Sequence, residues 1–215
     1  MITTDELVKK VRLLINEAEE DESISLLTED ARSLDKSIRM LLPQSVSVIQ
    51  SAKMPGKRVN VRSVQPSSVI IKENGDGAGC ISLPSDFVSL VQLGVKGWER
   101  PCSLLYPALS QQAVWQKNKC TRAGKSRPVC VEGVDFAGNR VAELYPLPET
   151  ALLEALVYEA SFNPNEGLDG YDEGMDDAVA YLCAALLYNM FEKYDAAKMF
   201  HSYAMALCGS VNVKK

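Results

Sequence analysis

Near the N-terminus, apolar residues recur three and four positions apart in two stretches, separated by acidic residues at 17–22. The first stretch follows Thr3 and Glu6, which have the spacing of a capping box. The second begins near Thr28, and Pro43 stops or kinks it; residues 45–52 either extend it or lead into the next segment. The pattern predicts two amphipathic helices, whose apolar stripes are Leu7, Val8, Val11, Leu14 and Ile15, then Ala31, Leu34, Ile38, Leu41 and Leu42.

The C-terminal part of the chain shows a wider helical stripe. It follows a Gly- and Asp-rich loop at residues 165–174 and runs from Met175 to Phe191. We expect a break at residues 193–195, then a second helix that ends before Gly209, a typical capping residue. The remaining residues alternate in polarity and predict a short extended tail.

Between these helical segments the apolar period changes from helical spacing to alternation. We expect strands at 59–64, 68–72 and 80–83, and a pair formed by 87–95 with 100–105. A hairpin of 129–134 with 140–145 turns near Gly138 and Asn139. Residues 107–118 predict a short helix, and 152–160 a strand in preference to a short helix, because Asn163-Pro164 follows.

Together these segments predict an α+β protein, a helical bundle from the N- and C-terminal helices with an inserted antiparallel β region. The predicted parts are residues 1–52 (N-terminal helices), 53–164 (β-rich insertion), 165–208 (C-terminal helix hairpin) and 209–215 (extended tail).

Composition places the chain among ordinary globular proteins. It has 215 residues, of which 47% are hydrophobic and 24% charged, enough apolar content to build a core. The chain contains no run of about 18 apolar residues, the length needed to span a membrane. The acidic first residues do not resemble a signal peptide. The six cysteines form no Cys-x-x-Cys pair, so we expect reduced, mostly buried thiols in a protein made in a cytoplasm.

Motifs that would carry catalysis or bind a cofactor fail when they are checked position by position. Residues 123–126 end like a phosphate-binding loop, but Lys119 occupies the position of its first glycine and Pro128 follows where a helix should begin. The glycines at 75–79 fit a turn. Residues 169–177 are acidic but lack the alternating Asp or Asn ligands and the final Glu of an EF-hand loop, so a weak divalent-ion site stays an open alternative there. His201 is the single histidine, expected at a helix–helix boundary. We therefore expect no catalytic residues, no metal and no cofactor.

Two segments remain as candidates for binding a partner. The loop at residues 117–127 concentrates positive charge in a chain whose net charge is −5, and it is either a solvated loop or a contact for nucleic acid or an acidic neighbour. The tail fits a strand added to a partner's sheet edge, with its lysines held by acidic residues. The candidate residues are Lys117, Lys119, Arg122, Lys125 and Arg127 in the loop and Val211, Val213, Lys214 and Lys215 in the tail.

Three short motifs in the β region resemble a known family. Leu83-Pro84-Ser85-Asp86-Phe87 enters an apolar strand, Gly97-Trp98-Glu99-Arg100-Pro101 follows it, and Leu144-Tyr145-Pro146-Leu147-Pro148 closes the region. With the order of helices and strands, these motifs resemble the head-to-tail adaptors of short-tailed bacteriophages, also called head-completion or tail tubular proteins, including ring proteins of crAss-like phages.

The resemblance implies a structural virion protein at the head–tail junction, assembled in the bacterial cytoplasm. In that family twelve copies form a ring beneath the portal and continue the channel for double-stranded DNA, which passes without sequence-specific binding; further tail proteins attach below. An acidic chain suits this role because it repels phosphate. Two alternatives stay open: a small hydrolase that cleaves cell-wall glycan with a carboxylate pair, one of raised pKa, and a cytoplasmic binding module that does not assemble.

Overall fold

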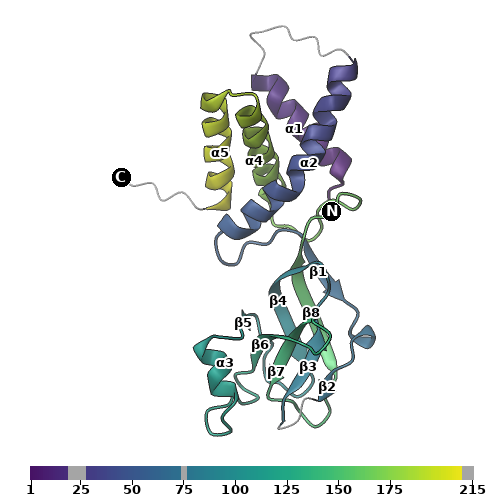
Figure 1. The fold of residues 1–215 in the computed structure, drawn as a ribbon, viewed down its shortest axis with the longest axis vertical. Helices are drawn as coiled ribbons and strands as arrows, with labels where there is room; N and C mark the ends of the chain where they lie inside the picture. The colour runs from purple at the N-terminus through teal and green to yellow at the C-terminus, as the bar shows by residue number, and fades with distance from the viewer. Residues whose placement is uncertain (19–27, 74–76, 210–215) are drawn as a thin grey trace, which may run out of the picture. The chain divides into compact units, whose positions relative to one another are not determined.

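The computed structural model describes residues 1–18, 28–73 and 77–209, and the chain divides into two compact units. The helical unit comprises residues 1–61 and 161–215, and the β unit comprises residues 62–160. Figure 1 shows the purple N-terminal and yellow C-terminal helices within the helical unit. The predicted α+β class, with terminal helices and central strands, is confirmed.

The N-terminal helix α1 (Thr4–Ala18) begins at the predicted capping box. The backbone N–H of Thr3 donates to Glu6 Oε2 at 2.8 Å, and the N–H of Glu6 donates to Thr3 Oγ1 at 3.2 Å. These bonds from Thr3 lower the pKa of Glu6. Two backbone donors at the start of α1 are thereby satisfied, as the sequence predicted.

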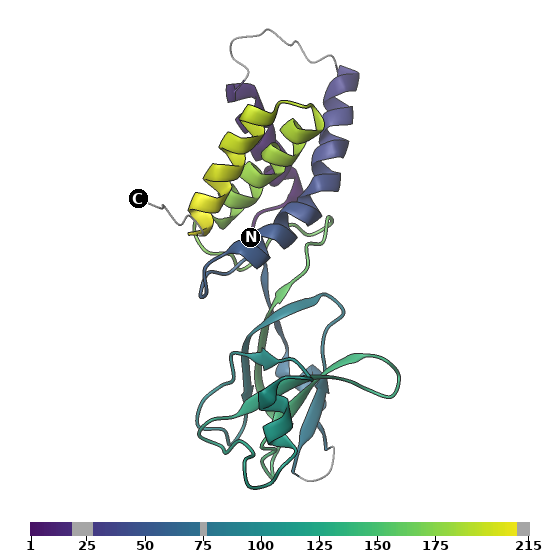
Figure 2. The same cartoon turned by 60° about the vertical axis from the view of Figure 1, so that its left-hand side comes forward.

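The second helix, α2 (Thr28–Ala52), runs through Pro43, so residues 45–52 extend the helix. Of the two predicted alternatives at Pro43, a stop and a kink, the stop is therefore excluded. Val46 and Ile49 are fully buried beyond the proline. Burying them outweighs the backbone hydrogen bond that Pro43 cannot make. Both views show the axis of α2 changing direction along its length (Figures 1 and 2).

The C-terminal helices α4 (Met175–Met190) and α5 (Tyr194–Cys208) pack against each other, and α4 also packs against α1 and α2. Because α4 is covered on several sides, it is apolar over most of its circumference. The break lies at residues 191–193, slightly before the predicted one, since Tyr194 and Asp195 already belong to α5. Gly209 caps α5 with φ +75°, the left-handed conformation predicted for it. No helix in the described part of the chain is both long and apolar enough to cross a membrane.

The β unit contains two sheets (Figure 2). The three-stranded sheet has the order β1-β8-β4, and the five-stranded sheet has the order β2-β3-β7-β6-β5. Pairing between β5 and β6 is parallel, whereas β6 with β7 forms the predicted antiparallel hairpin. The strands are β1 (Val61–Val64), β2 (Lys72–Glu73), β3 (Gly79–Ser82), β4 (Phe87–Val95), β5 (Leu105–Tyr106), β6 (Val129–Val134), β7 (Arg140–Tyr145) and β8 (Leu153–Ala160).

Two predicted strand assignments were wrong. Of the strand predicted at 68–72, only Lys72 lies in a strand, β2, because Pro66 opens a 3₁₀ turn (Pro66–Ser68) and the hydroxyl of Ser68 donates back to Gln65 O at 2.7 Å. Residues 100–105 are not the hairpin partner of β4, which pairs instead with β8; a single bridge joins Leu93 to Cys102. The choice of a distant partner depends on burial in the sheet and is invisible to local spacing.

The predicted helix at residues 107–118 is present but shorter. Helix α3 (Gln111–Gln116) begins after Ser110, whose hydroxyl accepts a hydrogen bond from the N–H of Ala113 at 3.3 Å. Its buried residues, Ala113 and Gln116, face the β unit. The α3 helix therefore fixes where the basic loop begins.

Candidate functional site

The basic loop at residues 117–127 is folded back onto the end of α3. The side chain of Gln116 is 2% exposed, and its Oε1 accepts from the N–H of Ala123 at 2.8 Å while its Nε2 donates to Gln112 O at 3.1 Å. The hydroxyl of Thr121 donates to Trp115 O at 2.8 Å. A buried amide therefore holds the loop in place.

The five cations predicted in this loop take two different roles. Lys117, Lys119, Lys125 and Arg127 are exposed. Arg122 is half-buried: its Nε donates to Gln116 O at 2.8 Å, and its guanidinium lies 5.5 Å from the centre of the Tyr145 ring. Burial, with Glu143 accepting from its hydroxyl, raises the pKa of Tyr145 to about 12. Arg122 thus fastens the loop, whereas the other four cations lie at the surface of the β unit.

Exposed apolar side chains lie beside the basic loop. Leu109 is 98% exposed, Val114 56% and Trp115 43%. The prediction of a helix at residues 107–118 did not show which of its apolar side chains are exposed, because a six-residue helix is too short for spacing to tell its buried face from its exposed one. Leu109, α3 and the basic loop together form a mixed surface of cations and apolar groups, called the α3 surface below.

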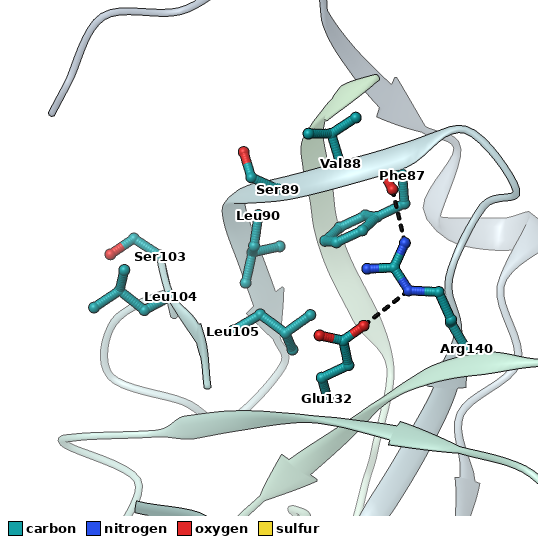
Figure 3. Close-up of a pocket in the computed structure, with 9 residues that line it drawn as sticks. All are labelled: Phe87, Val88, Ser89, Leu90, Ser103, Leu104, Leu105, Glu132 and Arg140. Carbon is teal, nitrogen blue, oxygen red and sulfur yellow. Dashed lines mark hydrogen bonds and ion pairs between the residues drawn. The ribbon is translucent and has the colours of Figure 1, made fainter. Parts of the chain in front are cut away.

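A small pocket lies between β4 and the segment that leads into β5 (Figure 3). Its volume is about 180 Å³. Apolar side chains make up most of the lining, and Glu132 and Arg140 form its charged end. The lining residues are Phe87, Val88, Ser89, Leu90, Ser103, Leu104, Leu105, Glu132 and Arg140.

Arg140 organises the charged end of this pocket. Its Nε donates to Glu132 Oε1 at 2.8 Å, and its Nη1 donates to the backbone oxygen of Phe87 at 2.9 Å. The guanidinium also lies over the Phe87 ring, 5.4 Å from its centre. The sequence did not identify this pocket, because its parts come from segments that are far apart in the chain.

The hydrolase alternative requires two carboxylates in one pocket, one of them with a raised pKa. The pocket in Figure 3 has one carboxylate, Glu132, paired with Arg140. Two described carboxylates with a shifted pKa are Glu6 and Asp135, and in both it is lowered; for Asp135 the cause is hydrogen bonding to Asn139 and Ala137. These shifts favour the ionised form and do not supply a general acid.

The helical unit also exposes large apolar side chains. Met190, Phe191 and Tyr194 are 57–59% exposed where α4 turns into α5. Farther along α5, Tyr203 is half exposed and contacts Tyr181, whose ring stacks on the buried Phe200. An aromatic cluster therefore runs from the core of the helical unit to its surface. We call the three residues at the turn the α4–α5 corner.

The acidic segment at residues 169–177 is held by a lysine and a backbone donor of the chain itself. Lys10 Nζ lies 2.5 Å from carboxylate oxygens of both Asp176 and Asp177, and Asp172 accepts from the backbone N–H of Arg58. Partial burial opposes the charge on Lys10, but the two carboxylates outweigh it and raise its pKa. In the described ranges, no three His, Cys, Asp or Glu side chains are grouped to hold a metal ion.

The remaining predicted chemistry falls on cysteines, His201 and the tail. The six thiols are free, and four are buried, as predicted. The thiol of Cys130 hydrogen-bonds to Cys102, which lowers the pKa of Cys102 to about 6 against the effect of burial and raises that of Cys130. His201 is exposed on α5, so its expected place at a helix boundary was wrong.

The predicted tail contacts, Val211, Val213, Lys214 and Lys215, lie outside the described residues. Comparison with known proteins gives no relative from which a role could be transferred: no protein-family model and no curated protein matches the chain.

Proposed function

We propose that the chain is a head–tail adaptor, a structural virion protein that docks on a portal, forms a ring and extends the channel for double-stranded DNA. The observation that carries the proposal is the arrangement of the chain. Both ends build one helical unit, and a β unit is inserted between α2 and α4. This is the architecture that the resemblance to adaptor proteins implies.

Exposed apolar groups on both units support assembly into a ring. A ring needs a heterologous contact, in which one patch of a subunit binds a different patch of the next. The α4–α5 corner is apolar and aromatic, whereas the α3 surface combines leucine, valine and tryptophan with lysine and arginine. Two unlike surfaces of this kind are what a head-to-tail closed ring requires.

The distribution of charge supports passage of DNA. The helical unit accounts for the whole net charge of −5, and the β unit has equal numbers of acidic and basic residues. A surface of this charge releases few counterions from DNA and holds it weakly. We assign Lys117, Lys125 and Arg127 of the α3 surface, which are exposed, to contacts with a protein neighbour.

Native mass spectrometry and electron microscopy of the purified chain test the proposal, with and without a purified phage portal protein. We expect rings, or ring formation on the portal, and at least a tenfold loss of assembly in Phe191→Asp. The matched control is His201→Asp, an equally polar change at another exposed position of the helical unit. A chain that stays monomeric on portal rings would overturn the adaptor, and cleavage of cell-wall glycan would favour the hydrolase.

A further inference from the structure

The pocket lies between the edges of the two sheets of the β unit. β4 is the outer strand of the three-stranded sheet, and β5 is the outer strand of the five-stranded sheet. Leu93 and Cys102 join the two edges through backbone hydrogen bonds of 2.7 and 2.8 Å. Toward Phe87 the edges separate, and the pocket opens between β4 and residues 103–105 (Figure 3). One side of β4 therefore borders a cavity over residues 87–90.

The size and lining of the pocket indicate what it can hold. Pockets for small-molecule ligands have volumes of about 300–1,000 Å³, and this pocket, near 180 Å³, is smaller. Its volume suits one or two aliphatic side chains. Leu90 and Leu105 form a half-buried base, whereas Leu104 is 59% exposed and Val88 42% exposed at the mouth. A strand edge beside an apolar pocket is the surface to which an extended peptide adds.

The tail of the chain has the pattern that such a surface recognises. Val211 and Val213 flank Asn212, so in an extended strand both valines point to one side, about 6.6 Å apart. Two basic residues, Lys214 and Lys215, follow the valines. At the charged end of the pocket, Glu132 offers a carboxylate, which can accept from a second cation while it is bound to Arg140.

We propose that this pocket receives residues 211–213 of a second copy of the chain, added as an extended strand along the open side of β4. The two valines fill the apolar part of the pocket, and the lysines lie near Glu132. The donor is a second copy because a ring needs a heterologous contact, so in this respect the inference rests on the proposed function. Tail exchange then links each subunit to the next in one direction.

A labelled peptide with the sequence of residues 209–215 tests the pocket directly. The receiving protein is the full chain with Val211→Asp and Val213→Asp, so that its own tail does not compete. We expect binding that weakens at least tenfold when Leu104→Asp is added. The matched control is Leu152→Asp, the same change at an equally exposed leucine outside the pocket. Equal binding to both variants, no binding to either, or equal binding of a peptide with both valines changed to aspartate would overturn the proposal.

Mixing two variants tests whether the donor is a second copy. Leu104→Asp has an intact tail and a blocked pocket, and the double valine variant has the reverse. Sedimentation of each alone should show monomers, whereas the mixture should form dimers through one intact contact. A mixture no more associated than its parts overturns exchange between copies. If rings still form on the portal with the double valine variant, the tail contact is rejected and the adaptor proposal is kept. If the peptide binds the pocket but no rings form, the tail contact is kept and the adaptor proposal is rejected.

Discussion

The helical unit and the β unit differ in how they bury their apolar side chains. The helical unit buries its apolar side chains in a single cluster to which α1, α2, α4 and α5 contribute. The β unit divides its buried side chains among three smaller clusters. In the large cluster, the helical spacing of apolar residues along each segment mostly decides which side chains are buried. In the three small clusters, the buried side chains depend on which distant strands pair.

The two units also differ in what they leave at the surface. The helical unit carries the net negative charge and an apolar corner at residues 190–194. The β unit is neutral overall, but it concentrates cations in one loop and has a pocket between its sheet edges. The β unit thus supplies most of the candidate binding groups, and the helical unit supplies most of the buried core.

The largest expected effect comes from removing a core leucine from each unit, which tests whether the two units unfold independently. Leu42→Ala in α2 and Leu144→Ala in β7 each remove a fully buried leucine and should cost about 2–5 kcal/mol of unfolding free energy. Both tryptophans of the chain lie in the β unit, so their fluorescence reports that unit, while circular dichroism at 222 nm follows the helices. In urea, Leu42→Ala should lower the dichroism midpoint and Leu144→Ala the fluorescence midpoint. If both midpoints move together in both variants, the two units unfold as one.

Substitution of Asn60 tests how the helical unit fixes the backbone at residues 60–61, where the chain passes into the β unit. Asn60 is fully buried with φ +58°; its Nδ2 donates to Ser161 O at 3.0 Å and its Oδ1 accepts from Asp169 N–H at 3.2 Å. Asn60→Ala removes both bonds and keeps the strained backbone, so we expect a loss of about 2–4 kcal/mol. Asn60→Gly relieves the backbone strain and should lose less. Equal losses in urea unfolding would show that the conformation contributes nothing.

Gln116 tests whether the basic loop is held by a buried amide. Gln116→Leu keeps similar size but removes the acceptor of Ala123 N–H, at a cost of about 1–3 kcal/mol to the β unit. Trypsin should then cleave within residues 117–127 several times faster, because the loop carries lysines and arginines. Gln111→Leu, at the exposed start of α3, is the control. Unchanged cleavage in Gln116→Leu would mean that the contacts of Thr121 and Arg122 hold the loop without the buried amide.

How far each unit was predictable follows from these physical differences. The stripes of α1, α4 and α5 are local, and Thr3, Glu6 and Gly209 mark helix ends by their own chemistry. The sequence left open whether Pro43 stops or kinks α2, because burial of Val46 and Ile49 lies beyond what a local rule can weigh. The pairing of β4 with β8 joins residues about 70 positions apart, such as Phe87 with Ala160. The pocket depends on that pairing, and the exposure of Trp115 depends on how the short helix α3 docks, so neither could be predicted from spacing.

The smallest expected effect concerns the ion pairs of Lys10, which link α1 to the start of α4 in the helical unit. Lys10→Met should cost about 0.5–1 kcal/mol at neutral pH, because these charges are partly exposed and partly screened. The pKa of Lys10 is raised in the folded state, so the contribution is complete below the unfolded pKa of about 10.4 and is lost as the pH rises through the folded value. The difference in urea stability between wild type and Lys10→Met should therefore be constant from pH 6 to 9 and shrink above about pH 10.4. Lys36→Met, at an exposed position of α2, is the control and should show no such change with pH. A difference between wild type and Lys10→Met that persisted at high pH would assign the loss to packing of the lysine side chain. The apolar stem of Lys10 would then stabilise the helical unit by burial, as the other side chains of its core do.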